Sequence, residues 1–301
     1  MRTGINNIEI ISAPSVLGLR SNGVELLGQK LLEHGLAEKI GTPLPVHHVP
    51  TLNDQRSNER DAVTHCLNPV MIHEFSITLG KVVATAISKK HFALVLGGDC
   101  SILIGIMQGL KSRGDYGLIF IDAHADFYEP EKSTTGEVAD MDLAIVTGRG
   151  PEILTNINHG KPYVADERVI HIGQRDWEET KKYGSQDIRD TGIKYVSMQD
   201  IAQKSAADIM DELMHHVANI DTKKIWIHYD TDVLHDDINP AVDYRIPGGL
   251  SFEQSEFFVR RLFDTGRIAG MSVTIYNPLL DESGVIGKNI AASIGRMFRQ
   301  Q

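Results

Sequence analysis

The sequence predicts an α/β protein built around a mainly parallel central sheet. Short runs rich in Val and Ile alternate along the chain with longer segments whose apolar residues recur at helical spacing. Several of these runs are apolar at every position, which is typical of strands covered by helices on both faces. No linker rich in Pro, Gly or Ser divides the 301 residues. We therefore expect one domain over residues 1–301.

The elements of the first half follow from this alternation. IEIIS at Ile8–Ser12 is the first predicted strand, and leucines at helical spacing predict a helix over Val24–Leu36. A long amphipathic pattern predicts a helix over Pro69–Lys90. Residues 91–98 (HFALVLGG) form a strand that runs into a tight turn at its two glycines, and a helix is expected over Ser101–Ser112.

The second half repeats the plan. GLIFIDAHAD is a continuous apolar strand that ends in acids, and the next strand, at Arg168–Asp176, has the same design. By contrast, the stretch Tyr128–Pro151 between them has no clear periodicity, and we expect it to be a long functional loop. The remaining elements are strands at Ile193–Met198, KIWIHYDTD and RIAGMSVTIYNP, and helices at Ala206–Ala218, Phe252–Phe263 and Val285–Phe298.

Charge and composition narrow the class of partner. The formal charge of −10 argues against nucleic acid or an anionic membrane surface and suits a small cationic substrate. Two cysteines do not make a disulfide framework in a chain of this length. The amino-terminal residues lack a basic region followed by an apolar stretch, and no apolar run approaches the ~20 residues of a membrane span. We expect a cytoplasmic protein.

Polar side chains follow three of the predicted strands. Asp99 and Cys100 come after the first glycine turn, a D-x-H-x-D motif follows GLIFI, and a D-x-D motif follows KIWIHY. Because ligands collect beyond the carboxyl ends of parallel strands, these side chains are expected to meet. Carboxylates gathered in one cleft repel one another unless a cation neutralises them, and carboxylates with an imidazole suit manganese or a similar ion. The sequence therefore predicts a metal site formed by Asp122, His124, Asp126, Asp230 and Asp232.

These motifs resemble those of the ureohydrolases, the family of arginase, agmatinase and formimidoylglutamase. GGDCS, IDAHAD, DTDVL and GGLS match in the same order from about Gly97 to Pro278. The resemblance implies a three-layer α/β/α sandwich, a binuclear manganese centre and hydrolysis of guanidino compounds by a metal-activated hydroxide. It also implies a trimer or hexamer of identical chains.

The resemblance assigns each ligand a place. Asp122 and Asp230 would bridge two ions, and Asp126 would bind the first ion and hydrogen-bond the hydroxide, which makes it a catalytic residue as well. His124 and Asp232 would complete the second ion.

Three positions depart from the family pattern. Cys100 stands where the family has a histidine ligand of the first ion, and it is either a softer ligand that suits Zn²⁺ or a buried thiol beside a weakened site. Ala139 stands where arginases have a histidine proton shuttle, so we expect Asp140, or else Asp142 or Glu137, to move protons. Ile275 replaces the glutamate that pairs with the guanidinium in arginases, which argues against an arginine-type substrate.

Two matches concern the substrate. Thr135 lies in the loop where arginases contact the amino-acid end of the substrate, and Glu178 falls near the position of an acid that binds its amino group. His228 and His171, inside strands, are expected to be core residues rather than ligands.

Together these features predict a metal-dependent hydrolase that cleaves a linear C–N bond of a guanidino, amidino or related compound. It would use Mn²⁺, as one or two ions, or Zn²⁺. The alternative is a catalytically weak metal-binding relative with a role in ligand sensing or assembly.

Overall fold

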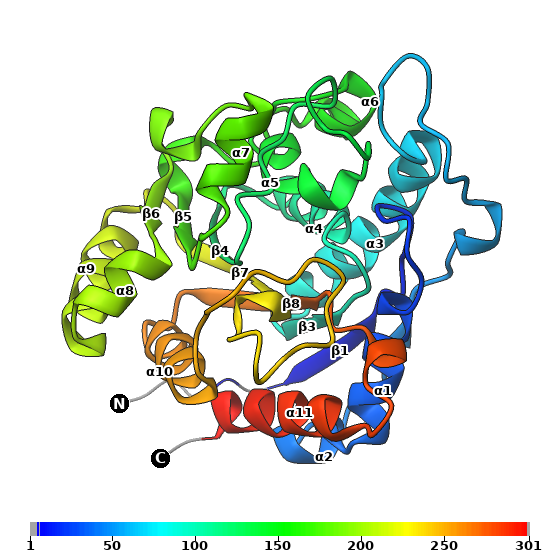
Figure 1. The fold of residues 1–301 in the computed structure, drawn as a ribbon. Helices are drawn as coiled ribbons and strands as arrows, with labels where there is room; N and C mark the ends of the chain where they lie inside the picture. Colours follow the sequence, from blue (N-terminus) through cyan, green and yellow to red (C-terminus); the bar gives the residue numbers. More distant parts are fainter. Residues whose placement is uncertain (1–4, 6, 300–301) are drawn as a thin grey trace.

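The computed structural model describes residue 5 and residues 7–299, and its centre is a sheet of eight parallel strands in the order β2-β1-β3-β8-β7-β4-β5-β6. Helices cover both faces of this sheet (Figure 1), so the predicted three-layer α/β/α sandwich is confirmed. The strands are β1 (Ile8–Ser12), β2 (His47–His48), β3 (Phe92–Leu96), β4 (Tyr116–Ile121), β5 (Val169–Ile172), β6 (Lys194–Val196), β7 (Lys224–Asp230) and β8 (Ile268–Thr274).

Alternating side chains of each strand enter two different cores. In β4, Ile119 and Ile121 join one core while Leu118 and Phe120 join the other, as the two-residue period of a strand requires. The first core is covered by α1 (Leu27–Glu33), α2 (Leu36–Ile40), α8 (Met198–Gln203), α9 (Ala206–Asn219), α10 (Phe252–Phe263) and α11 (Val285–Phe298). The second is covered by α3 (Pro69–Ser88), α4 (Ile102–Lys111), α5 (Asp142–Val146) and α6 (Glu152–Thr155).

Helix α3 has the length and mean hydropathy, 20 residues and 1.4, that could span a membrane. In the fold it instead packs along α4 and buries one face, which includes Ile72, Phe75, Leu79 and Val83. Its close approach to α4 depends on Gly105 and Gly109, where an added Cβ would lie less than 3 Å from the α3 backbone. The apolar character of α3 therefore reflects its place in the second core.

The structure differs from the sequence prediction where glycine interrupts a helical pattern. The helix predicted over Val24–Leu36 is divided into the 3-10 turn η1 (Val24–Leu26), α1 and α2, because Gly35 takes a left-handed conformation with φ of 77° between α1 and α2. The stretch Tyr128–Pro151, expected to be a loop, contains the 3-10 turn η3 (Val138–Asp140) and α5. Strand β2 has only two residues, too few to show a period in the sequence.

Candidate metal centre and pocket

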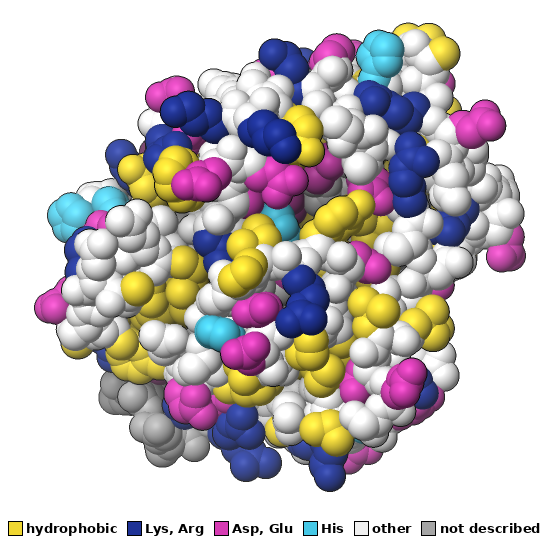
Figure 2. Space-filling view, viewed as in Figure 1, with side chains coloured by type: hydrophobic (Ala, Val, Ile, Leu, Met, Phe, Trp, Pro, Cys, Tyr) yellow, Lys and Arg dark blue, Asp and Glu magenta, His cyan; other side chains and the backbone are white. Residues whose placement is uncertain are grey.

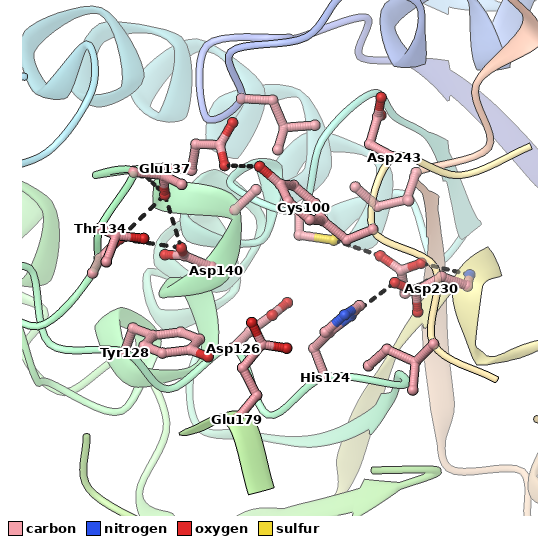
Figure 3. Close-up of a pocket in the computed structure, with 18 of the residues that line it drawn as sticks. Cys100, His124, Asp126, Tyr128, Thr134, Glu137, Asp140, Glu179, Asp230 and Asp243 are labelled. Carbon is pink, nitrogen blue, oxygen red and sulfur yellow. Dashed lines mark hydrogen bonds and ion pairs between the residues drawn. The ribbon is translucent and has the colours of Figure 1, made fainter. Parts of the chain in front are cut away.

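The two acidic motifs meet at the carboxyl edge of the sheet. Strands β4 and β7 are hydrogen-bonded neighbours, so the residues that follow them leave the sheet side by side. His124 Nδ1 lies 2.9 Å from Asp232 Oδ2, and the backbone N–H of Ala123 donates to Asp232 Oδ1 at 3.2 Å. The five predicted ligands therefore converge, as Figure 3 shows for His124, Asp126 and Asp230.

Both motifs use the same local turn. The Asp122 side chain accepts a hydrogen bond from the backbone N–H of His124 at 2.7 Å, and the Asp230 side chain accepts one from Asp232 at 2.7 Å. An aspartate that accepts from the residue two positions on stabilises the turn that ends a strand. Asp126 has a left-handed φ of 46°. The spacing D-x-H and D-x-D thus fixes each turn and leaves the second carboxylate oxygen for the site.

Residues in and directly after β5 hold the D-x-H-x-D segment from the other side. The His171 ring Nε2 lies 2.7 Å from the carbonyl oxygen of His124, and the Asp176 carboxylate accepts from the N–H of Ala125 at 3.1 Å. The Arg175 guanidinium donates to the carbonyl oxygen of Asp232 at 2.7 Å. Sequence reasoning missed these supporting roles, although the polar residues of IHIGQRD at the end of a buried strand were a signal for them.

Cys100 lies on the floor of the same site. Its thiol donates to Asp230 Oδ2 at 2.8 Å and contacts Thr274 Oγ1 at 3.3 Å. The preceding Gly98 passes so close to Ser15 that an added Cβ would lie 1.7 Å from the Ser15 carbonyl oxygen, so only glycine allows this turn. The chain is therefore built to bring Cys100 against the end of β7.

Among the described residues, two overlapping groups of potential ligand atoms lie in this site. In each group the ligand atoms all lie within 4.8 Å of one another. One group is Asp122, His124 and Asp126, and the other is Cys100, Asp122, His228 and Asp230. His228 was expected to be a core residue, and it is fully buried, but its ring also reaches the ligand cluster.

The site concentrates negative charge in a buried space. Burial and the neighbouring Asp232 raise the pKa of Asp122 to about 7. Burial and nearby carboxylates also raise the pKa of Asp126 and of Asp230 well above the usual range. Burial alone would raise the pKa of Asp232, but the His124 imidazole beside it outweighs burial and lowers that pKa.

This donor set fits divalent metal ions. Among the described residues, the buried Asp122 Oδ2 lacks a hydrogen-bond partner, and the fully buried Asp142 has the carboxyl group of Asp126 beside it. Carboxylates this close to one another, some of them without partners, are stabilised by a cation. Oxygen and imidazole ligands suit Mn²⁺, whereas a thiol favours softer ions such as Zn²⁺.

A pocket of about 390 Å³ opens above these ligands. Cys100, His124, Asp126, Asp230 and Asp232 form its floor. In Figure 2 a hollow on this face exposes acidic and histidine side chains in its interior. The pocket wall is also acidic, because Glu137, Asp140, Glu179 and Asp243 line it, and Arg245 is the only Lys or Arg among the lining residues.

Some of the residues predicted to bind substrate or to transfer protons line the pocket, and others do not. Thr135 and Asp140 both line the pocket, and the Thr135 hydroxyl donates to Asp140 Oδ2 at 3.2 Å. Glu178 is exposed and lies outside the lining residues, because helix α7 (Trp177–Tyr183) turns its neighbour Glu179 toward the pocket instead. Asp142 is buried beside Asp126 and does not line the pocket.

Asp140 is set up to carry a proton. Burial, with a smaller contribution from the charge of Glu137, raises the pKa of Asp140 to about 8. Glu137 itself accepts from the Tyr244 hydroxyl at 2.6 Å and from the backbone N–H of Arg20 at 2.7 Å. Asp140 therefore keeps its proton at neutral pH.

The three departures from the family pattern lie together. Cys100, Ala139 and Ile275 pack into one small apolar cluster with Val16, Leu19, Val24 and Val242. Ile275 has a left-handed φ of 74°, which is rare for a β-branched residue and costs roughly 1–3 kcal/mol. Its backbone N–H donates to the Gly98 carbonyl at 2.9 Å, which helps to hold this conformation. The pocket therefore has an apolar wall next to the ligands.

Comparison with known proteins gives one consistent answer. A family model described as the arginase family matches residues 10–298. An arginase of Staphylococcus aureus (strain COL) is 28% identical over 298 residues, which are 97% of this chain and 96% of the relative. An arginase of Bacillus subtilis (strain 168) is 29% identical over 287 residues, 93% of this chain and 94% of the relative. The solved structure of an arginase from Bacillus caldovelox superimposes with a TM-score of 0.86 at 27% identity, over 98% of this chain and 99% of the other.

Proposed function

Because this chain belongs to the arginase family of hydrolases, we propose that it is a metal-dependent enzyme that cleaves a linear C–N bond of an amidino, guanidino or related compound. The observation that carries the proposal is the convergence of Asp122, His124 and Asp126 with Asp230 and Asp232 on the floor of a pocket. A cluster of capping acids without a metal would leave this repulsion uncompensated in a buried site.

The ligand residues would hold two ions between β4 and β7. Asp122 and Asp230, one from each strand, would serve both ions. Cys100 and Asp126 would complete the first metal site, and His124 and Asp232 the second. Bound ions would supply a water of lowered pKa and would polarise the substrate. Asp126 faces the pocket and would orient that water by accepting its proton in a hydrogen bond.

Asp140 would supply the proton that the leaving amine needs. Its carboxyl lies in the pocket wall, and its raised pKa of about 8 keeps it protonated at neutral pH. The hydroxyls of Ser133 and Thr135, each 3.2 Å from Asp140 Oδ2, hold the carboxyl in place. General acid–base help of this kind contributes about 10²–10⁴-fold to a rate.

The lining favours a cationic substrate. Glu179 and Asp243 present carboxylates to the pocket, whereas Arg245 is already engaged with Asp236 at 3.3 Å. These carboxylates would attract a substrate that carries an ammonium group. A carboxylate on the substrate would meet few positive side chains to pair with. Glu179 is the acid that we propose for the ammonium group.

The apolar wall narrows the substrate further. A guanidinium nitrogen placed against Ile275 and Ala139 would lose its hydration without gaining a partner. An amidine whose reactive carbon carries a hydrogen or a short alkyl group fits this wall better. We therefore place amidino and formimino compounds ahead of guanidino compounds as substrates.

The proposal also covers the bound ion, the oligomeric state and the cellular location. We propose Mn²⁺ or Zn²⁺ as the bound ion, a trimer or hexamer of identical chains, and the cytoplasm. Metal analysis and light scattering on the purified protein would test the first two directly.

The proposal is tested by assaying the protein, loaded with Mn²⁺ or with Zn²⁺, against a panel of formimino, amidino and guanidino compounds. We expect release of ammonia, formamide or urea that stops on chelation and in Asp126→Asn. Asp221→Asn is the matched control, because Asp221 is exposed and precedes β7 at the opposite edge of the sheet.

An alternative role as a catalytically weak, ligand-sensing relative is favoured by the apolar cluster of Cys100, Ala139 and Ile275. Metal-dependent thermal stabilisation by a panel compound, without turnover of any compound, would support that role and reject the enzymatic one.

A further inference from the structure

We infer that Cys100, Asp122, His228 and Asp230 form a mixed sulfur, nitrogen and oxygen metal site, in which His228 supplies the imidazole from strand β7. This first metal site would take a Zn²⁺-like ion rather than Mn²⁺, with His228 in place of Asp126 as its fourth ligand, and Asp126 would then act on the water alone. The inference rests on the proposed metal centre but on no particular substrate.

Geometry is the first support. The ligand atoms of these four residues all lie within 4.8 Å of one another, and all four residues are buried. They come from three different segments, the turns after β3 and β4 and the strand β7. A group drawn from separate segments and yet this compact is a better candidate site than neighbouring acids on one loop.

The setting of His228 is the second support. Its Nδ1 lies 3.0 Å from Ser272 Oγ, which also accepts the indole N–H of Trp226 at 3.1 Å. Nε2 has only a long contact of 3.4 Å, to Thr274 Oγ1. Metal-binding histidines commonly have one ring nitrogen fixed by such a partner while the other faces the ion.

The ring of His228 is also fixed in orientation. It stacks on Phe120 with ring centroids 4.8 Å apart. The Thr274 hydroxyl lies between the remaining ligand groups, because its Oγ1 is 3.3 Å from both Cys100 Sγ and Asp230 Oδ2. The imidazole thus faces the thiol and the carboxylate across one hydroxyl group.

The chemistry of the donors decides the ion. One thiolate, one imidazole and two carboxylates make a set typical of four-coordinate Zn²⁺, whereas Mn²⁺ prefers oxygen ligands. The second metal site, with His124, Asp122, Asp230 and Asp232, lacks sulfur. The two sites of this chain should therefore differ in their preference for metals.

Cobalt substitution tests the inference without any substrate. We expect one equivalent of Co²⁺ to give a sulfur-to-cobalt charge-transfer band together with the intense visible bands of a four-coordinate site. Cys100→Ser should remove the charge-transfer band. His228→Asn keeps a group at the Nδ1 position and removes Nε2, so it should change the visible bands and weaken Zn²⁺ binding by at least about tenfold.

His73→Asn is the matched control for His228→Asn. His73 lies on α3, outside the ligand groups, and its Nδ1 lies 2.7 Å from the carbonyl oxygen of Ile153. Asparagine keeps a group at that Nδ1 position and removes Nε2, as it does at position 228. This variant should keep the cobalt spectrum and the Zn²⁺ affinity of the unaltered protein.

X-ray absorption identifies the ligands of the bound ion without relying on the folding of His228→Asn. In His124→Asn loaded with one Zn²⁺, we expect a sulfur ligand at about 2.3 Å and imidazole scattering, which His228 would supply. Absence of sulfur or imidazole there, or an unchanged cobalt spectrum in His228→Asn, would overturn the inference. Because no assay of turnover is involved, failure of the proposed enzymatic function would leave these results standing.

Discussion

His124 Nδ1 lies 2.9 Å from Asp232 Oδ2, and this contact joins the turn after β4 to the turn after β7. Although burial lowers the pKa of His124, the Asp232 and Asp122 carboxylates outweigh it and raise that pKa well above its usual value. A divalent ion would replace the proton between these two side chains. The proposed second metal site is therefore held together by the same residues with or without a bound ion.

Asp232→Asn should remove most binding at the second metal site. The amide keeps the size of the side chain but loses the charge that faces His124, so affinity for Mn²⁺ should fall about 10–100-fold or more. Calorimetric titration of the metal-free protein measures this change. Asp237→Asn, a highly exposed acid five residues away, is the control, and an equal loss of affinity there would contradict the assignment.

Ile275→Glu should shift the specificity of the enzyme toward guanidino compounds. A carboxylate in place of the apolar side chain would pair with a guanidinium nitrogen that Ile275 leaves without a partner. We expect the ratio of kcat/KM for guanidino over amidino substrates to rise at least about tenfold, as expected for one charged hydrogen bond. Ile275→Gln has the same size without the charge, and a similar rise in that variant would argue against charge pairing.

Asp140 should give the reaction an upper pH limit. Because its pKa is raised to about 8, the protonated form that donates to the leaving amine is lost as the pH rises through 8. We expect kcat to decline above about pH 8, and Asp140→Asn to lose this limb together with about 10²–10⁴-fold in kcat. Steady-state kinetics from pH 6 to about pH 10 would measure both effects.

The raised pKa of Asp140 should also make the stability of the fold depend on pH. Its pKa rises from 3.8 to about 8 on folding, so the folded state binds the proton more tightly and loses stability as the pH rises between these values. Asp140→Asn should reduce this slope in urea unfolding. A slope that is unchanged in the variant would show that Asp140 is not the titrating group.

Glu179→Gln should weaken binding of substrates that carry an ammonium group. Glu179 lines the pocket while Glu178, the residue expected from the sequence, is exposed. We expect KM for such a substrate to rise about tenfold in Glu179→Gln, in line with the loss of a charged hydrogen bond. The same change at Glu178 tests the sequence prediction, and a larger effect there than at Glu179 would reverse our assignment.

Much of the fold could be predicted because buried strands and helices show characteristic patterns of apolar residues in the sequence. The apolar runs of β3, β4, β7 and β8 showed a covered parallel sheet, and the acids at the ends of β4 and β7 showed which edge carries the site. The interruption at Gly35 was harder to predict, since a helical apolar pattern continues across it while the backbone changes conformation.

The sequence by itself determined the two acidic motifs that we propose as metal ligands, because D-x-H-x-D and D-x-D fix their turns through hydrogen bonds between residues two positions apart. Only the tertiary structure decided that Cys100, Ala139 and Ile275 share one apolar wall and that His228 reaches Cys100, since these contacts join segments that are distant in the sequence. It also selected Glu179 over Glu178, because the packing of a short helix sets which of two adjacent side chains faces the pocket. Local hydrogen bonding can be recognised from spacing along the chain, whereas contacts between distant segments depend on the completed sheet.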